Sequence, residues 1–172
     1  MHNKLTDAAK STREAMARQH DLQKAFNEPV TDVPQGSALT VIKSQAEKVV
    51  KHLLFSEEVA LKDGGIEGST AFQDAFRKNR IDTADGRSLK DLQLLNRLFK
   101  YRCSYMIYSK AFDALPAQVK TEVYAQLLAV LDGRNTSKDY AHLSDSERRH
   151  IKGILLETKK DLPSTWKTLG AE

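Results

Sequence analysis

The stretch SLKDLQLLNRLFKYRCSYMIYSKAFDA, residues 88–114, is the most apolar part of the chain and decides the fold that we expect. Its apolar residues recur every three or four positions, as in an α-helix, and further leucine and aromatic side chains extend the apolar face over most of the circumference. Ser88 and Asp91 have the spacing of a capping box, with Asp in place of Glu. We therefore predict a helix from Ser88 to Ala114 at the centre of the fold. The residues at helical spacing are Leu89, Leu92, Leu95, Phe99, Cys103, Met106 and Ile107.

The N-terminal segment, residues 3–26, is polar and Ala-rich and carries only a thin apolar stripe. Thr12 and Gln19 interrupt this stripe, and a linker with two prolines follows at 27–36. A stronger amphipathic pattern covers residues 39–54, so the two helices could pair as an antiparallel hairpin. Because residues 3–26 look too polar to be well buried by their own chain, we expect the two helices to form a docking surface. The stripe consists of Leu5, Ala8, Ala15, Leu22 and Phe26.

Local signals delimit the remaining helices. Ser69 can cap a short helix. Pro116 suits the first turn of the next helix, and Gly133 suits its C-terminal stop. Ser144 and Glu147 form a capping box in front of the last long helix. The short helix after Ser69 is expected to bury Ala71, Phe72, Ala75 and Phe76.

These segments together predict an all-α protein of about six helices around a central apolar helix. We expect residues 1–36 to form an N-terminal helix and linker, and residues 37–172 to form a helical core domain. Trp166 is expected to pack back onto the body, because a large indole left in water forfeits about 2 kcal/mol or more of burial.

The composition fits one ordinary globular domain and excludes several kinds of site. Of 172 residues, 40% are hydrophobic and 29% are charged, with 27 Lys and Arg against 23 Asp and Glu. A net charge of +4 produces only a weak electrostatic field, and the basic residues are dispersed along the sequence. Both features argue against nucleic acid as a partner. One cysteine excludes an internal disulfide framework, a Cys-rich zinc site and C-x-x-C-H haem attachment. No apolar run is long enough to cross a bilayer, and the chain as given shows no signal peptide.

Six short motifs lie at residues 54–58, 86–89, 97–101, 103–108, 112–116 and 141–144. They resemble the C-terminal region of large uncharacterised bacterial proteins. The opening Met1-His2-Asn3 also resembles an internal stretch of those proteins. The resemblance implies a further N-terminal portion and an exported, periplasmic location. Some of those proteins carry upstream haem-attachment motifs, but this chain has none, so the resemblance itself implies little about chemistry. A redox or haem-associated role, with His2 or His20 as a ligand, is kept as the alternative.

Two motifs invite a catalytic or metal interpretation. Cys103 could be a nucleophile with a histidine partner, but it falls among Leu, Phe and Tyr, where burial would raise its pKa rather than activate it. Glu147 and His150 have the i, i+3 spacing of carboxylate-bridged di-iron bundles, but the chain holds no second copy of the motif. The capping box explains Glu147 better. We therefore predict no catalytic residue and no metal ligand.

Two other patterns have simple structural explanations. Residues 82–86 resemble a calcium loop but fail its ligand spacing, so a turn is the better interpretation. Tyr101, Tyr105 and Tyr108 alternate with cations and could stack bases if exposed. Aromatic stripes at helical spacing are more often core or interface.

The function that the sequence favours is a non-catalytic helical interaction or accessory module of unknown ligand. Its partner would be another protein or the remainder of a larger chain. The alternative is a redox or haem-associated domain of an exported protein, with His2 or His20 as the ligand.

Overall fold

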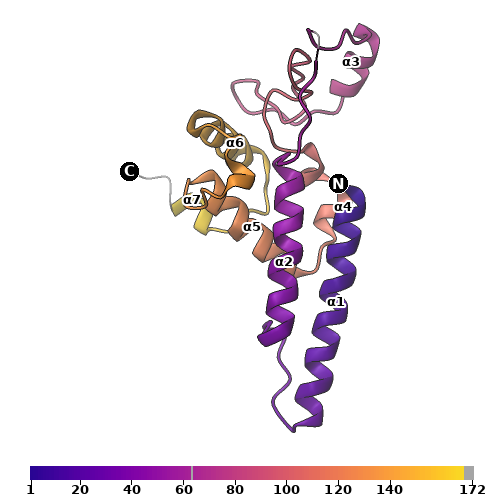
Figure 1. The fold of residues 1–172 in the computed structure, drawn as a ribbon, viewed down its shortest axis with the longest axis vertical. Helices are drawn as coiled ribbons and strands as arrows, with labels where there is room; N and C mark the ends of the chain where they lie inside the picture. The colour runs from indigo at the N-terminus through magenta and orange to yellow at the C-terminus, as the bar shows by residue number, and fades with distance from the viewer. Residues whose placement is uncertain (63, 169–172) are drawn as a thin grey trace. The chain divides into compact units, whose positions relative to one another are not determined.

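The protein is all-helical, as predicted. The computed structural model describes residues 1–62 and 64–168, and within these ranges it contains no strand, only an isolated antiparallel bridge between Leu92 and Phe99. None of the helices in the described ranges has the length and apolar character that a membrane crossing needs. The α-helices are α1 (His2–Ala25), α2 (Gly36–Leu53), α3 (Thr70–Arg77), α4 (Lys110–Asp113), α5 (Ala117–Leu131), α6 (Asp145–Thr158) and α7 (Thr165–Thr168), with 3₁₀ turns at Tyr105–Tyr108 and Lys138–Tyr140 (Figure 1).

The chain forms two compact units. Unit 1 comprises residues 1–52 and 106–127, and unit 2 comprises 53–105 and 128–172. Both sides of the predicted boundary after residue 36 lie in unit 1, and the division into two domains at that point stays a prediction. Each unit is described by itself below.

In unit 1, α2 runs back along α1 as a helical hairpin (Figure 1), and α4 also contacts α1. The buried face of α1 is continuous because polar residues complete it at three- and four-residue spacing. Thr12 and Gln19 therefore do not interrupt the face but belong to it, and Leu22 and Phe26, predicted to share it, are exposed. The expectation that this helix is too polar to be buried by its own chain is wrong. Its buried residues are Leu5, Ala8, Thr12, Met16, Gln19 and Gln23.

The buried glutamines of α1 hold the linker before α2. Gln19 donates from Nε2 to the carbonyls of Thr31 (3.1 Å) and Val33 (2.9 Å), and its Oε1 accepts from the amide of Gln35 (2.8 Å). The Oε1 atom of Gln23 accepts from the amide of Thr31 at 3.2 Å. Because the linker has few regular backbone hydrogen bonds, its amides and carbonyls need other partners. The side chains of Gln19 and Gln23 provide them. This explains why polar residues lie on the buried face.

The predicted amphipathic face of α2 is confirmed, and α5 also buries an apolar face. Ile42, Ala46 and Val49 of α2 are fully buried, as are Val119 and Val123 of α5. Burial of each large aliphatic side chain stabilises the fold by about 2 kcal/mol. These local apolar patterns were strong enough to specify the helices.

The predicted central helix from Ser88 to Ala114 is wrong. Residues 88–104 contain no helix, and regular helix within the stretch is confined to the 3₁₀ turn at 105–108 and the four-residue α4. Leu89, Phe99 and Cys103 are nevertheless buried, whereas Leu95 and Leu98 are exposed. The apolar residues were identified correctly as interior at several positions, but their backbone is irregular.

Distant partners explain why no helix forms there. The carbonyls of Leu94 and Asn96 accept from the amides of Ile66 (2.8 Å) and Leu61 (2.9 Å) rather than from residues four positions ahead. Leu94 also has a positive φ of 59°, which a helix does not allow. Tertiary hydrogen bonds thus override the helical periodicity.

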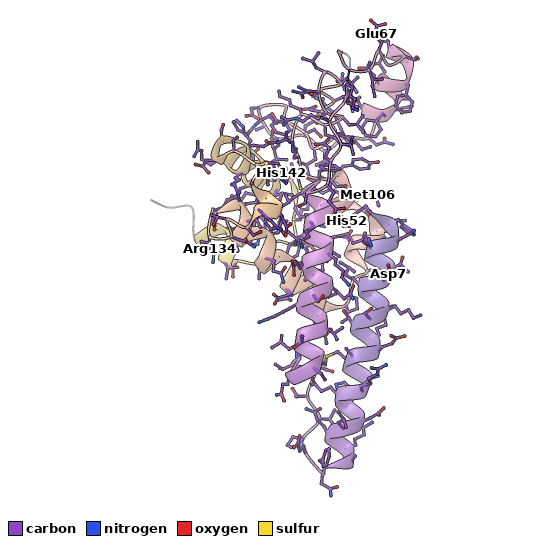
Figure 2. All side chains as sticks on the ribbon, in the orientation of Figure 1. Asp7, His52, Glu67, Met106, Arg134 and His142 are labelled. Carbon is purple, nitrogen blue, oxygen red and sulfur yellow. The ribbon has the colours of Figure 1, made fainter. Side chains whose placement is uncertain are left out.

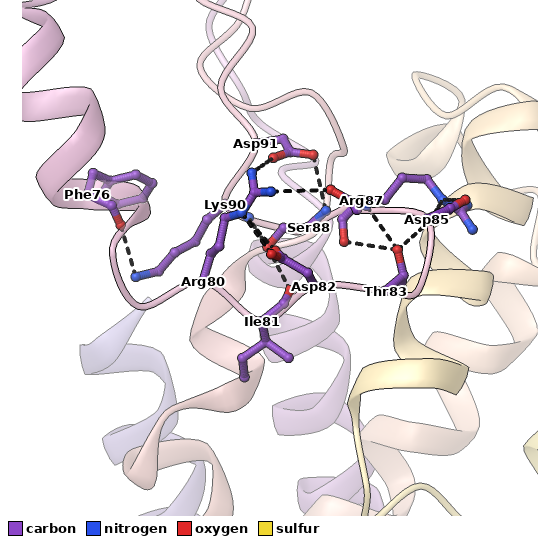
Figure 3. A network of polar contacts seen from close by, with 11 residues as sticks. Phe76, Arg80, Ile81, Asp82, Thr83, Asp85, Arg87, Ser88, Lys90 and Asp91 are labelled. Atoms are coloured by element: carbon purple, nitrogen blue, oxygen red, sulfur yellow. Dashed lines mark hydrogen bonds and ion pairs between the residues drawn. The ribbon is translucent and has the colours of Figure 1, made fainter.

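The side chains of the Ser88 turn form the expected capping contact without a helix after it. Asp91 accepts from the amide of Ser88 at 3.1 Å and from Nη1 of Arg80 at 3.1 Å (Figure 3). Lys90 donates from Nζ to the carbonyl of Phe76 at 3.3 Å. These contacts tie the turn to α3 and to the segment that follows it.

Helix α3 begins directly after Ser69, but the Ser69 side chain makes no capping hydrogen bond and the helix has no buried residue. Phe72 is exposed and stacks on Phe76, whose ring in turn contacts Tyr105 edge-on at a centroid distance of 5.4 Å. The expected buried face is therefore wrong. Eight residues make a helix too short to gain burial unless a neighbour covers it.

The remaining helix signals are confirmed. Helix α5 starts immediately after Pro116, and Gly133 follows its end with a φ of +72°. Ser144 is the N-cap of α6 and accepts from the amide of Glu147 at 3.2 Å. Trp166 is fully buried, as expected.

Candidate functional site

The most elaborate polar arrangement in unit 2 is centred on the carboxylate of Glu147. This residue lies in the first turn of α6, and its side chain is 11% exposed. Its Oε1 accepts from the backbone amide of Arg102 (3.1 Å), and its Oε2 accepts from Nη1 of the same residue (3.2 Å). The carboxylate thus binds a segment 45 residues earlier in the chain, which joins α6 to the irregular stretch before the 3₁₀ turn.

The guanidinium of Arg102 connects further segments. Its Nε lies 3.4 Å from Oε2 of Glu58, and its Nη1 also donates to the carbonyl of His142. His142, labelled in Figure 2, bonds through Nε2 to the carbonyl of Leu54 at 2.8 Å. Two carboxylates and a carbonyl therefore engage one guanidinium, and this arrangement holds the irregular backbone in place.

A hollow opens beside this cluster. Arg97 donates from Nη2 to the carbonyl of Lys100 (3.0 Å), and its Nη1 lies 3.6 Å from Oε1 of Glu147. The Nζ atom of Lys100 lies 5.4 Å from the centroid of the Tyr101 ring. The imidazole of His150 packs edge-on against the same ring. The hollow has a volume of about 440 Å³, within the range of small-ligand sites. Its lining residues are Arg97, Lys100, Tyr101, Ser144, Ser146, Glu147 and His150.

Arg148 is a buried cation with a structural role. Its Nε donates to the carbonyl of Leu143 (3.2 Å) and its Nη2 to that of Tyr140 (2.9 Å), while Nη1 donates to Val130. Sequence reasoning did not identify this role. The available signal was spacing, since Arg148 lies three residues before the buried Ile151 and so on the same helix face.

Cys103 lies in the interior, as predicted. Its side chain is completely buried, and this burial raises the pKa of the thiol to about 12. The thiolate is the reactive form of cysteine, so the group is held in its unreactive protonated state at neutral pH. The surrounding backbone is irregular rather than helical.

The Glu147–His150 pair does not converge on a shared point. The carboxylate is engaged by arginines, and His150 is exposed beside Tyr101. Within residues 1–62 and 64–168, no three His, Cys, Asp or Glu side chains are grouped so that they could hold a metal ion.

Residues 82–86 form a turn, as interpreted from their spacing. Asp85 accepts from Nε of Arg87 (2.9 Å) and from the hydroxyl of Thr83 (2.5 Å), as Figure 3 shows. These hydrogen bonds, with Arg87 contributing most, lower the pKa of Asp85 to about 2. The carboxylate is thereby fixed within its own turn.

The two histidines proposed as haem ligands lie at different places on α1. His2 is exposed at the first residue of the helix. His20 bonds through Nε2 to the carbonyl of Thr31 (3.1 Å) and lies 3.3 Å from Oδ1 of Asp32. Eighteen helical residues separate them by about 27 Å, so they cannot serve one iron together. Their role as ligands stays a prediction.

The tyrosine stripe is divided between different environments. Tyr101 is buried, and Tyr105 packs against Phe76 and Phe99 with centroid distances of 5.4 and 5.9 Å. These two rings are therefore interior or interface groups rather than a stacking platform.

No family model matches this chain, and no curated protein or solved structure matches it. The resemblance to the C-terminal region of large bacterial proteins stays a prediction. A functional proposal must therefore come from the surfaces and side-chain clusters themselves.

Proposed function

We propose that this protein is a non-catalytic helical interaction module that presents the end of its α1–α2 hairpin to a protein partner. The observation that supports this proposal most directly is a group of exposed apolar side chains at that end, here called the hairpin tip. It comprises Leu22 (56% exposed), Phe26 (71%), Val30 (50%) and Val33 (63%). A cluster of exposed large apolar side chains on one connection is typical of an interaction surface.

The hairpin tip is held in its exposed form by the buried face of the same helix. Gln19 and Gln23 bind the backbone of Thr31, Val33 and Gln35, which fixes the linker. A linker secured in this way cannot easily fold its valines inward. Because the surface is already organised, binding a partner would cost little conformational entropy.

The charge around the hairpin tip indicates the chemistry of the partner. Residues 21–35 contain three acidic side chains and one lysine, so this segment has a net charge of −2. The whole chain, in contrast, has a net charge of +4. An apolar pocket bordered by lysine or arginine would complement this surface. An anionic membrane would repel it. The acidic side chains are Asp21, Glu28 and Asp32.

The test places a photo-crosslinking amino acid at position 26 and exposes the full chain to an extract of its host. The proposal is supported if the crosslinked peptide of the partner is apolar and flanked by Lys or Arg, and if Val30→Ser with Val33→Ser abolishes the product. Leu95→Ser is the matched control, since Leu95 is also exposed but lies in unit 2. Crosslinks to lipid, to a second copy of the chain, or to a partner indifferent to the valine changes would overturn it.

A further inference from the structure

The hollow beside Glu147 is a second surface feature, separate from the hairpin tip. It is built from two parts of unit 2 that are distant in sequence: the segment with Arg97, Lys100 and Tyr101, and the first turns of α6. We call it the α6 hollow. Because it lies in unit 2 and the hairpin tip lies in unit 1, the two surfaces can be tested independently.

The cations of the α6 hollow exceed the carboxylates near it. Glu147 also lines the hollow, but both of its carboxylate oxygens already accept hydrogen bonds from Arg102. The guanidinium of Arg102 also forms an ion pair with Glu58. The residues that line the hollow include two cations, Arg97 and Lys100, and one carboxylate, that of Glu147, so the lining carries a net charge of +1 with His150 neutral. The local charge therefore favours an anion.

Arg97 is oriented but not fully satisfied by the protein. Its Nη2 bonds to the carbonyl of Lys100, and its Nη1 remains 3.6 Å from Glu147. Its Nε has no hydrogen-bond acceptor but is enclosed and cannot reach a ligand, so the unused donor capacity lies at Nη1. A guanidinium with unused donor capacity at a hollow is suited to the several acceptor oxygens of an oxyanion.

The start of α6 adds further donors. Ser144 is the N-cap, so the amides of Asp145 and Ser146 occupy positions that have no partner within the helix. The hydroxyl-bearing residues Ser144 and Ser146 line the hollow and are exposed. The positive end of the helix dipole lies at the same place. Three kinds of donor thus surround one space: a guanidinium, an ammonium and the helix start.

From this convergence we propose that the α6 hollow is a binding site for a small phosphate-class oxyanion, either free phosphate or a phosphate monoester. A tetrahedral anion with several acceptor oxygens can engage donors that approach from different directions, which a single carboxylate cannot do as fully. The exposed imidazole of His150, which lines the hollow, would contact the organic part of an ester.

The experiment titrates the ¹⁵N-labelled full chain with sodium phosphate at constant ionic strength, with sodium chloride as the reference. Saturable shifts of the Lys100 and Ser146 amides that chloride does not produce support the proposal. Arg97→Gln and Lys100→Gln should each weaken phosphate binding by about tenfold, the loss expected for one charge-assisted hydrogen bond. Lys78→Gln is the matched control, because Lys78 is an exposed cation of unit 2 outside the hollow.

A second titration with glycerol 2-phosphate distinguishes the two sources of the anion. Tighter binding than that of inorganic phosphate indicates a monoester, and equal binding indicates free phosphate. Arg97→Gln also removes a neighbour of Glu147, so Lys100→Gln provides the variant that leaves the carboxylate contacts intact. Shifts that do not saturate, that chloride reproduces, or that Lys100→Gln leaves unchanged would overturn the proposal.

Discussion

The carboxylate of Glu147 binds both the backbone amide and the guanidinium of Arg102, at 3.1 and 3.2 Å. This carboxylate therefore anchors main chain as well as side chain. The segment that it anchors has no helix of its own, so its position depends on such contacts. Glu147 has the spacing of a capping-box residue, but its side chain acts on a distant part of the chain.

Glu147→Ala should destabilise the protein by about 2–4 kcal/mol, because it removes one of the two carboxylates that pair the largely enclosed Arg102 guanidinium and leaves the Arg102 amide without its acceptor. Urea unfolding at pH 7 measures this loss. Glu14→Ala is the control, since the Glu14 side chain is 55% exposed and pairs only within α1 at 4.0 Å. Equal unfolding midpoints for the two variants would contradict the anchoring role.

The buried thiol of Cys103 predicts a pH dependence of stability. Burial raises its pKa to about 12 from an ordinary value of 9.0, so above pH 9 the unfolded chain loses this proton while the folded chain keeps it. The folded state then binds more protons, and stability falls as pH rises from about 9 to 12, by up to about 1.4 kcal/mol per pH unit. The stability difference between wild type and Cys103→Ala, measured by urea unfolding, isolates this contribution from other titrating groups.

Thiol labelling provides an independent check of the same burial. Native Cys103 should react with a disulfide reagent only at the rate at which the chain opens, and urea should accelerate it to the rate of an exposed cysteine. The thiol would be accessible if native Cys103 were labelled rapidly and if the free energy of unfolding of the wild type and of Cys103→Ala changed equally between pH 9 and 12.

The sequence predicted those elements whose signals are local. Ser144 and Gly133 mark helix ends through contacts with residues within a few positions, and both were identified correctly. Residues 88–104 were misassigned because the amide that binds the carbonyl of Leu94 belongs to Ile66, which no helical periodicity can reveal. The same reason hid the candidate site. Arg102 and Glu147 are 45 residues apart, and nothing in either local pattern indicates the other.

Gly65 should be required where its segment crosses the backbone of Leu94 and Leu95. Its φ is +97°, and a Cβ atom there would lie 2.8 Å from the Cα of Leu95 and closer still to the Leu94 carbonyl. Gly64 has a similar φ of +87° but open space around it, so it is the matched control. Both alanine variants should incur backbone strain of about 1–2 kcal/mol, and Gly65→Ala should incur at least about 1 kcal/mol more from the clash. Thermal unfolding of the two variants measures the difference, and equal losses would show that the two segments do not approach so closely.

The buried glutamine of α1 should control the order of the hairpin tip. Gln19→Leu fills the buried position with an apolar side chain but removes three hydrogen bonds to the linker, so we expect a loss of about 1–3 kcal/mol. The specific consequence is at Gln35, whose amide donates to the Gln19 side chain and should lose hydrogen-exchange protection first. Arg18→Leu, at the exposed neighbouring position, should leave that amide protected. If Gln35 exchanges equally slowly in both variants, the glutamine does not secure the linker, and the preorganisation of the hairpin tip would have to come from another contact.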